Sequence, residues 1–164
     1  MDAALKKATV NRRDVLYRLL QYSLFEESLT DLNEMNDDAL FDYPWFDAYF
    51  SEPDREAYFI YDRESDQLLG FAMINTYLMQ SETGHRIAEF MVLPKYRRKG
   101  IGTKAAAACF SLHPGLWEVR PALGSQQAYS FWQKAIQSYT GGRYTWRDQV
   151  FSFDTEHEQR EEVR

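Results

Sequence analysis

A basic, glycine-containing segment constrains the fold of this chain more than any other feature. The stretch "VLPKYRRKGIGTKAAAACF", residues 92–110, joins an apolar run closed by a proline to an alanine-rich run that favours helix. Four positive charges lie between Lys95 and Lys99, and Gly100 and Gly102 follow them. A helix start has N–H groups without partners, and glycine lets a ligand approach closely. The segment predicts a strand, a basic loop and a helix whose N-terminus binds phosphate groups.

Two other phosphate-binding motifs fit this segment less well. The P-loop pattern fails, because it needs four residues between its glycines and a Gly-Lys-Ser/Thr ending. The stretch Gly100–Ala105 fits the G-x-G-x-x-A dinucleotide fingerprint, but residues 94–99 separate it from its strand, and only about sixty residues follow it. An ordinary turn before a helix is the remaining alternative.

Hydrophobic periodicity predicts the other elements. Asn11, with Asp14 reaching back, is expected to cap a helix that ends near Glu27. We expect a loop or short helix over residues 28–43 and a helical turn over 44–50, with Pro44 near its start. Strands are predicted at 57–61, 67–77, 86–93 and 116–120. Helices are predicted at 101–111 and from about 125 to Gly141-Gly142, where the glycines end the second helix. A terminal hairpin around Arg147–Gln149 follows.

This order predicts a single mixed α/β (α+β) domain. Three antiparallel strands come first, and the later strand-helix-strand unit implies one parallel pair. We expect a mostly antiparallel central sheet of about six to seven strands flanked by helices. The domain is assigned to residues 1–155, and residues 156–164 are expected to form a disordered, charged tail.

Composition limits the possible environments and ligands. The 164 residues include one cysteine, Cys109, which excludes an internal disulfide and fits a reducing compartment. No signal peptide and no apolar run of membrane-spanning length occur, so a cytoplasmic location is expected. The net charge of −6 and the shortness of the basic run argue against a nucleic-acid partner. His85, His113 and His157 are scattered in the sequence, so no metal site is expected.

The glycine loop resembles the acetyl-coenzyme A signature of the GNAT acetyltransferase superfamily. That signature, Arg/Gln-x-x-Gly-x-Gly/Ala after a strand ending in Val-x-Pro, is matched by Val92, Pro94, Arg97, Gly100 and Gly102. The element order is similar from about Ala8 to Phe153. The resemblance implies that loop N–H groups bind the coenzyme pyrophosphate, and that the pantetheine arm lies where the third strand splays from the next.

The same resemblance implies a set of coenzyme-binding residues and acetyl-CoA as co-substrate, with no metal. The implied residues are Met91, Val92, Leu93, Arg97, Arg98, Lys99, Gly100, Ile101, Gly102, Thr103, Ser125 and Trp132. The oxyanion donor is expected to be the backbone N–H of Val92, or that of Met91, freed where the strand bulges.

Glu89 is the candidate general base. Strand alternation places Glu89 and Met91 on one face and Phe90 and Val92 on the other. The family often has a glutamate at this place, and apolar neighbours would raise the carboxyl pKa into a range that suits a base. The alternative is a solvated or salt-bridged carboxylate, paired with Arg86.

A general acid is harder to assign. Family members commonly have Asn-x-x-Ala-x-x-Phe/Leu-Tyr on the last long helix, where this chain has Ser125 and Trp132 in the places of the asparagine and the tyrosine. Tyr129 is the candidate substitute, with packing as the alternative. Ser125 can also act as a helix cap. Thiolates leave readily, so catalysis can also proceed without a donor.

The segment from Thr30 to Phe50 is expected to shape the acceptor site. It combines six acids with several aromatic residues, which suits an amine with an apolar or cationic body, such as a polyamine, an aminoglycoside or a lysine side chain. The alternative is a solvated acidic surface over core aromatics. The sequence therefore predicts an N-acetyltransferase that acts on a small or protein amine by direct attack in a ternary complex. The other hypothesis is a non-catalytic acyl-CoA-binding module, and we expect a monomer or homodimer with no membrane contact.

Overall fold

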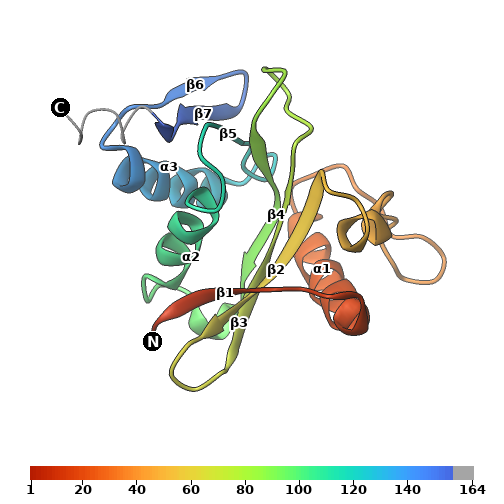
Figure 1. Cartoon of the computed structure of the whole chain (residues 1–164). Coiled ribbons are helices and arrows are strands. Elements are labelled where there is room, and N and C mark those ends of the chain that lie inside the picture. Colours follow the sequence, from red (N-terminus) through yellow and green to blue (C-terminus); the bar gives the residue numbers. More distant parts are fainter. Residues whose placement is uncertain (157–164) are drawn as a thin grey trace.

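A seven-stranded, mostly antiparallel sheet forms the centre of the protein (Figure 1). The computed structural model describes residues 1–156, and the predicted disordered tail lies almost wholly outside them. The sheet order is β1-β2-β3-β4-β5-β7-β6, and β4 and β5 form its parallel pair. The strands are β1 (Ala3–Lys7), β2 (Arg55–Asp62), β3 (Leu68–Asn75), β4 (His85–Val92), β5 (Leu116–Val119), β6 (Thr145–Arg147) and β7 (Val150–Asp154). The predicted fold class is confirmed.

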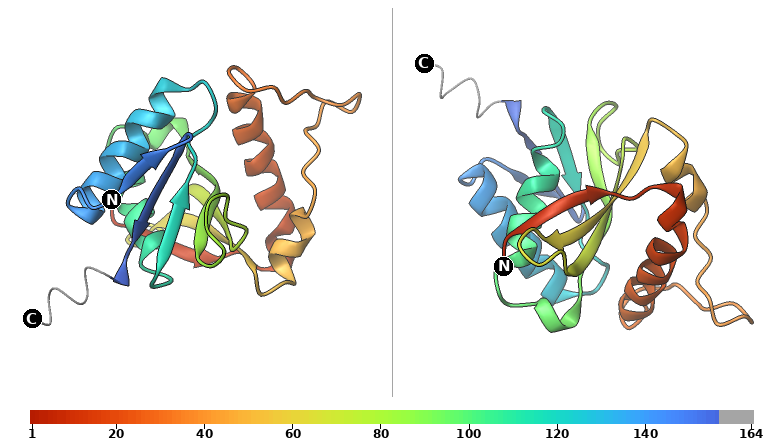
Figure 2. Two further views of the ribbon diagram at one scale, coloured as in Figure 1. Left: turned by 90° about the horizontal axis from the view of Figure 1, so that it is seen from above. Right: turned by 60° about the horizontal axis from the view of Figure 1, so that its bottom comes forward.

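Helices cover both faces of the sheet. Helix α1 (Arg13–Glu27) lies on one face, and α2 (Ile101–Phe110) and α3 (Gln126–Thr140) lie on the other (Figures 1 and 2). The predicted loop over 28–43 is confirmed, and the helical turn that follows it is the 3-10 helix Phe46–Phe50. Helix α3 ends as expected at Gly141, whose φ of 65° is in the left-handed region that favours glycine.

Strand β1 was not predicted from the sequence. Its five residues pair antiparallel with β2, from Ala3 opposite Asp62 to Lys7 opposite Tyr58. The segment is short, and its alanines and lysines carry neither the bulk nor the alternation that marks a strand. Its structure comes from the exposed ladder of β2, which supplies the hydrogen-bond partners.

The predicted cap of α1 is wrong. A 3-10 turn over Val10–Arg12 precedes the helix, and Arg12 occupies the N-cap position without a side-chain cap. Asn11 instead accepts a hydrogen bond from the Thr9 hydroxyl. The asparagine is satisfied locally within the turn, so the helix begins later than its sequence suggests.

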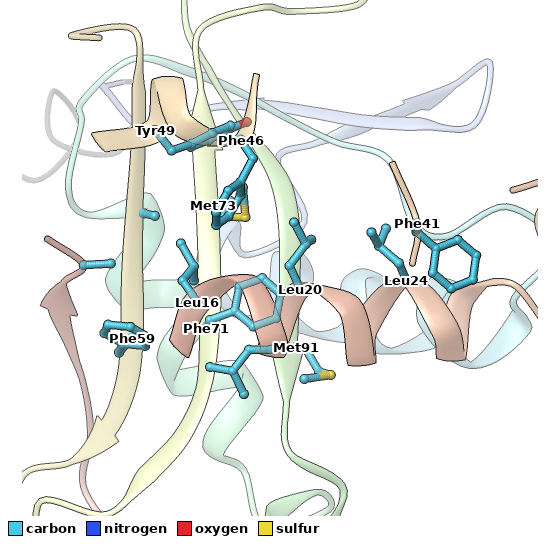
Figure 3. Packing of buried hydrophobic residues seen from close by; sticks show 13 residues of the cluster. Leu16, Leu20, Leu24, Phe41, Phe46, Tyr49, Phe59, Phe71, Met73 and Met91 are labelled. Carbon is cyan, nitrogen blue, oxygen red and sulfur yellow. The ribbon is translucent and has the colours of Figure 1, made fainter. Parts of the chain in front are cut away.

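The core between α1 and the sheet consists of leucines from the helix packed on phenylalanine and methionine side chains of the strands. Leu16, Leu20 and Leu24 recur along α1 and are 0%, 0% and 5% exposed. They pack toward Phe71, Met73 and Met91 of β3 and β4 (Figure 3). Burial of this size stabilises the fold by about 2 kcal/mol per leucine side chain. The packing fixes the last turn of α1 beside the middle of β4.

The opposite face has an aromatic core. Trp117, Phe110, Phe151 and Ile136 are fully buried there, and Trp132 is 6% exposed. The Phe110 ring contacts Trp117 edge-on at 5.4 Å between centroids. This core joins α2 and α3 to β5 and β7. A separate cluster that contains Ile101, Ala105 and Val92 holds the start of α2 beside β4.

A bulge in β4 determines which side chains face α1. The register with β3 changes from Met73 opposite Glu89 to Ile74 opposite Ile87, so Ala88 is the extra residue. Beyond the bulge, Glu89 and Met91 point to the α1 face while Phe90 packs against α3, as alternation predicted. The bulge therefore lies before Met91, and not at the residues that the oxyanion argument assumed.

Candidate active site

The start of α2 is open to an anion. Gly100 occupies the N-cap position with a φ of 77° and no side-chain cap. The first helical bond runs from the Lys104 N–H to the Gly100 carbonyl, 3.2 Å, which leaves the N–H groups of residues 101–103 without helical partners. Apart from Gly100 itself and its two chain neighbours, no heavy atom of the described residues lies within 4 Å of the place where a Gly100 Cβ would stand. Unpaired amides, open space and adjacent cations fit a diphosphate.

At position 102 a glycine is needed because a neighbouring side chain leaves no room for a Cβ, whereas Gly100 faces open space. A Cβ at this position would lie 2.7 Å from Cε2 of Phe131, closer than side chains pack. Phe131 also stacks on Phe90 with 5.7 Å between ring centroids. The glycine therefore lets α2 approach α3 beside β4.

Arg97 joins three elements. Its Nε donates to the Val92 carbonyl at 2.8 Å, and its two terminal nitrogens bind both Glu26 oxygens at 2.8 and 3.0 Å. Bidentate pairs of this kind fix orientation as well as distance. The arginine of the signature thus fastens the basic loop to the end of β4 and to the last turn of α1.

The edge of β4 that faces β5 is open. The two strands pair only from His85 opposite Trp117 to Ile87 opposite Val119, where β5 ends. On the other side the Leu93 N–H donates to the Leu69 carbonyl of the β3 side at 2.8 Å. Antiparallel ladders alternate, so the Val92 N–H points away from β3, toward the open edge. Of the two predicted oxyanion donors, this geometry favours Val92 over Met91.

A cavity of about 520 Å³ lies on the α1 side of β4. Its charged residues are five acids and one arginine: Glu27, Asp31, Glu34, Asp42, Glu89 and Arg120. The remaining lining residues are Leu24, Leu32, Asn33, Phe41, Tyr43, Pro121, Ala122 and Leu123. Acidic and apolar surfaces therefore meet within one hollow, to which the loop after α1 contributes several residues.

Glu89 lies in this cavity with an altered proton affinity. The pKa of its carboxyl is raised from 4.5 to about 8, mainly by burial and also by the neighbouring charge of Glu27, while a hydrogen bond from Tyr43 and the charge of Arg86 oppose the change. The alternative salt bridge with Arg86 does not form among the described residues, and Arg86 donates to the Tyr77 carbonyl at 3.4 Å. A carboxyl of this kind accepts a proton near neutral pH.

Glu27 is the second unusual carboxyl. Burial and the charges of Asp31 and Glu26 raise its pKa from 4.5 to about 7. Glu27 is also the last residue of α1, where the helix dipole disfavours negative charge. Two carboxyls that share a cavity and repel each other therefore retain protons to higher pH than free glutamates.

Tyr43 connects Glu89 to the rigid part of the fold. Its hydroxyl hydrogen-bonds to Glu89 and to Tyr49, and the Tyr49 hydroxyl accepts a bond of 3.0 Å from Nδ2 of Asn75. Burial raises the pKa of Tyr43 well above its ordinary value, so the phenol stays protonated and donates. The chain of bonds orients the Glu89 carboxyl toward the cavity.

The candidates on α3 lie on the other side of the sheet. The Tyr129 ring packs against Trp146 and Phe151, at 4.9 and 5.6 Å between centroids. Trp132 packs edge-on against Phe90 at 4.9 Å. Ser125 accepts a bond of 3.1 Å from the Ala128 N–H, so its hydroxyl caps the helix.

The histidines are less scattered than the sequence suggested. His85 and His113 stack with 3.9 Å between ring centroids, and His113 pairs with Glu56. His157 lies outside the described residues. Among residues 1–156 no group of three or more potential ligands could hold a metal ion. Cys109 is buried as expected, and burial raises its thiol pKa to about 12.

Sequence reasoning placed Glu89 and the glycine loop but not the residues around them. Glu27 and Tyr43 belong to α1 and to the loop after it, and no spacing in the chain relates them to Glu89. Arg86 lies on the same strand as Glu89 and was considered as its partner. The sequence also gave no functional role to Phe131, although its contact with Gly102 places it beside the basic loop. The one available signal was the acidic, aromatic composition of residues 30–50.

A splayed strand, an open helix N-terminus and a carboxyl-containing cavity define a class of coenzyme A-dependent acyltransferases. A model of the acetyltransferase (GNAT) family matches residues 21–135, and the chain belongs to this family. A comparison with curated protein sequences finds no match. Within the described residues, no helix has the length and apolar character needed to cross a bilayer.

Solved structures share the fold at low sequence identity. An acetyltransferase from Thermus thermophilus matches with a TM-score of 0.66 and 13% identity, over 94% of this chain and 97% of that one. Spermidine N-acetyltransferase from Vibrio cholerae, in complex with CoA and spermine, matches with 0.66 and 8%, over 94% and 96%. Aminoglycoside acetyltransferase AAC(6')-Ib, in complex with coenzyme A and kanamycin, matches with 0.65 and 13%, over 96% and 98%.

Proposed function

We propose that the protein is an N-acetyltransferase that transfers the acetyl group of acetyl-CoA to a primary amine by direct attack in a ternary complex. One observation carries the proposal. The Glu89 carboxyl lies in a cavity on β4, the same strand whose open edge and following loop fit the coenzyme. Acceptor and thioester can therefore meet across a single strand.

The loop and the open edge would hold acetyl-CoA. Amides of residues 101–103 and the cations Arg98 and Lys99 would bind the pyrophosphate, with Thr103 in the first turn of α2. Met91, Val92 and Leu93 would line the pantetheine arm. Acetyl-CoA would supply an activated acyl group, and residues of the protein would carry out the proton transfer and stabilise the oxyanion.

Glu89 would take the first proton from the ammonium group of the acceptor, which frees the nitrogen lone pair. As the nitrogen attacks the carbonyl carbon, the Val92 N–H would donate to the developing oxyanion. The C–N bond forms, the C–S bond breaks, and the second proton lost by nitrogen neutralises the thiolate. This scheme needs no acid from Tyr129, whose ring packs against the terminal hairpin.

The test combines turnover with coenzyme binding. Glu89→Gln should lower kcat/KM for an amine by about 10²- to 10⁴-fold, while calorimetry gives an unchanged Kd for acetyl-CoA. Glu64→Gln, an exposed carboxylate in the β2–β3 turn, is the matched control and should leave both values unchanged. Equal rates for Glu89→Gln and the wild type from pH 6 to 9 would exclude Glu89 as the base.

Two other outcomes would reject the proposal as a whole. Binding of NAD(H) in place of any coenzyme A species would assign the glycine loop to dinucleotides. Tight acetyl-CoA binding without thiol release or amine binding, across a broad amine panel, would support the non-catalytic acyl-CoA-binding module.

A further inference from the structure

We propose that the acceptor carries a second positive charge, separated from its reactive amine by an apolar chain, and that Glu27 is the residue that selects for it. The inference rests on the proposed function, because it takes Glu89 as the group that receives the proton. It narrows the acceptor from primary amines in general to diamines and longer polyamines.

Glu27 and Glu89 reach the same cavity from different elements. Glu89 comes from the middle of β4 and Glu27 from the last turn of α1. Apolar side chains line the same space, including Leu24, Phe41 and Leu123. The cavity thus presents two carboxyls and an apolar wall, which matches an alkyl chain with a cation at each end.

The Glu27 carboxylate has no partner of its own. No hydrogen bond or ion pair of its side chain occurs in the described part of the chain, although most of the group is removed from solvent. Its neighbour Glu26 shows the contrast, because both Glu26 oxygens bind Arg97. A partly buried and unpaired carboxylate is unfavourable, and a ligand cation would relieve that cost.

The other charges around Glu27 do not supply a counter-ion. Asp31, Glu34 and Asp42 add negative charge from the loop after α1. Arg120 also lines the cavity, but it is exposed and forms no ion pair with Glu27 in the described part of the chain. The Arg86 charge acts on Glu89, not on Glu27.

The chemistry of the transfer makes one cation insufficient. The reacting amine enters as an ammonium, gives its proton to Glu89 and becomes neutral before it attacks. After this step it no longer compensates the charge of Glu27. A second ammonium, with a pKa near 10 when free, keeps its charge throughout and would remain paired with Glu27. A monoamine would leave Glu27 uncompensated in the reactive complex.

The test compares two amines of equal length. 1,6-Diaminohexane and heptylamine differ only at the distal end, which is ammonium in one and methyl in the other. Thiol release at pH 8 should give a kcat/KM for the diamine about ten- to a hundredfold above that for heptylamine in the wild type. Glu27→Gln should reduce this ratio to within about threefold of one, chiefly through the KM of the diamine.

Glu64→Gln is the matched control, since Glu64 is an exposed acid in the β2–β3 turn and does not line the cavity, and the kcat/KM ratio of this variant should stay near that of the wild type. An unchanged diamine preference in Glu27→Gln, or no preference in the wild type, would overturn the inference and leave the proposed function intact.

If the proposed function is wrong, the measurements give a different set of results. If neither amine supports thiol release, calorimetric Kd values of the two amines, with coenzyme A bound, still test the charge preference. Tighter binding of the diamine by the wild type, lost in Glu27→Gln, would support the inference. Equal binding would refute it.

Discussion

The paired carboxyls make the stability of the ligand-free protein depend on pH, and Glu27→Gln should reveal this. The folded pKa of Glu27 is raised, so its neutral form is favoured in the folded state. The resulting destabilisation is absent below the unfolded pKa of 4.5, grows between pH 4.5 and about 7, and stays constant at higher pH. The neutral amide of glutamine removes it at every pH.

The size of the effect follows from the pKa values. A change from 4.5 to about 7 corresponds to roughly 3 kcal/mol at 1.36 kcal/mol per pH unit. The cavity is open to water, and screening reduces this to about 1–2 kcal/mol. Glu27→Gln should therefore be more stable than the wild type by about 1–2 kcal/mol at pH 8.5, a Tm increase of roughly 2–8 °C.

Thermal and urea unfolding at pH 4 and pH 8.5 measure the difference. The two proteins should have similar stability at pH 4 and separate at pH 8.5. Glu34→Gln, exposed at the same cavity, should change stability by less than about 0.5 kcal/mol at both values. A Glu27→Gln protein that is no more stable than the wild type at pH 8.5 would refute the argument that this carboxylate is buried without a partner.

Three further predictions concern the loop, the helix cap and the base. Ser125→Ala should lower the free energy of unfolding by about 1 kcal/mol in urea titrations, because the helix loses its side-chain cap. Gly102→Val should weaken acetyl-CoA binding in calorimetry, since its side chain would collide with Phe131 and displace the loop. Tyr43→Phe removes a hydrogen bond that lowers the pKa of Glu89, so the acid limb of kcat/KM should move to higher pH; a limb at the wild-type position would show that this bond does not act on the base.

Much of the fold was predictable because its signals are local. The proline after β4, the cations and Gly100 lie within seven residues of each other, and each has a direct physical meaning for strand, loop or helix. Helix α3 likewise shows its buried face in the spacing of Trp132, Ala135 and Ile136. Such features can be recognised without knowledge of the tertiary structure.

The parts that escaped prediction depend on distant partners. Strand β1 is ordered by β2, from which it is separated by about fifty residues of chain. The proton affinity of Glu89 depends on Glu27 and Tyr43, which only the packing of α1 and its loop brings near. The residue types were visible in the sequence, but their electrostatic coupling was a property of the fold.

The bonds of Arg97 connect the two proposed substrate sites. One guanidinium group anchors the phosphate-facing loop, the carbonyl end of β4 and the glutamate next to Glu27. If the loop binds the coenzyme as proposed, a shift of Arg97 would displace Glu26 and with it the last turn of α1 beside the cavity. Substitution of Arg97 should consequently weaken the binding of both acetyl-CoA and the amine. The loss of kcat/KM measured for one reactant alone would then be smaller than the total effect.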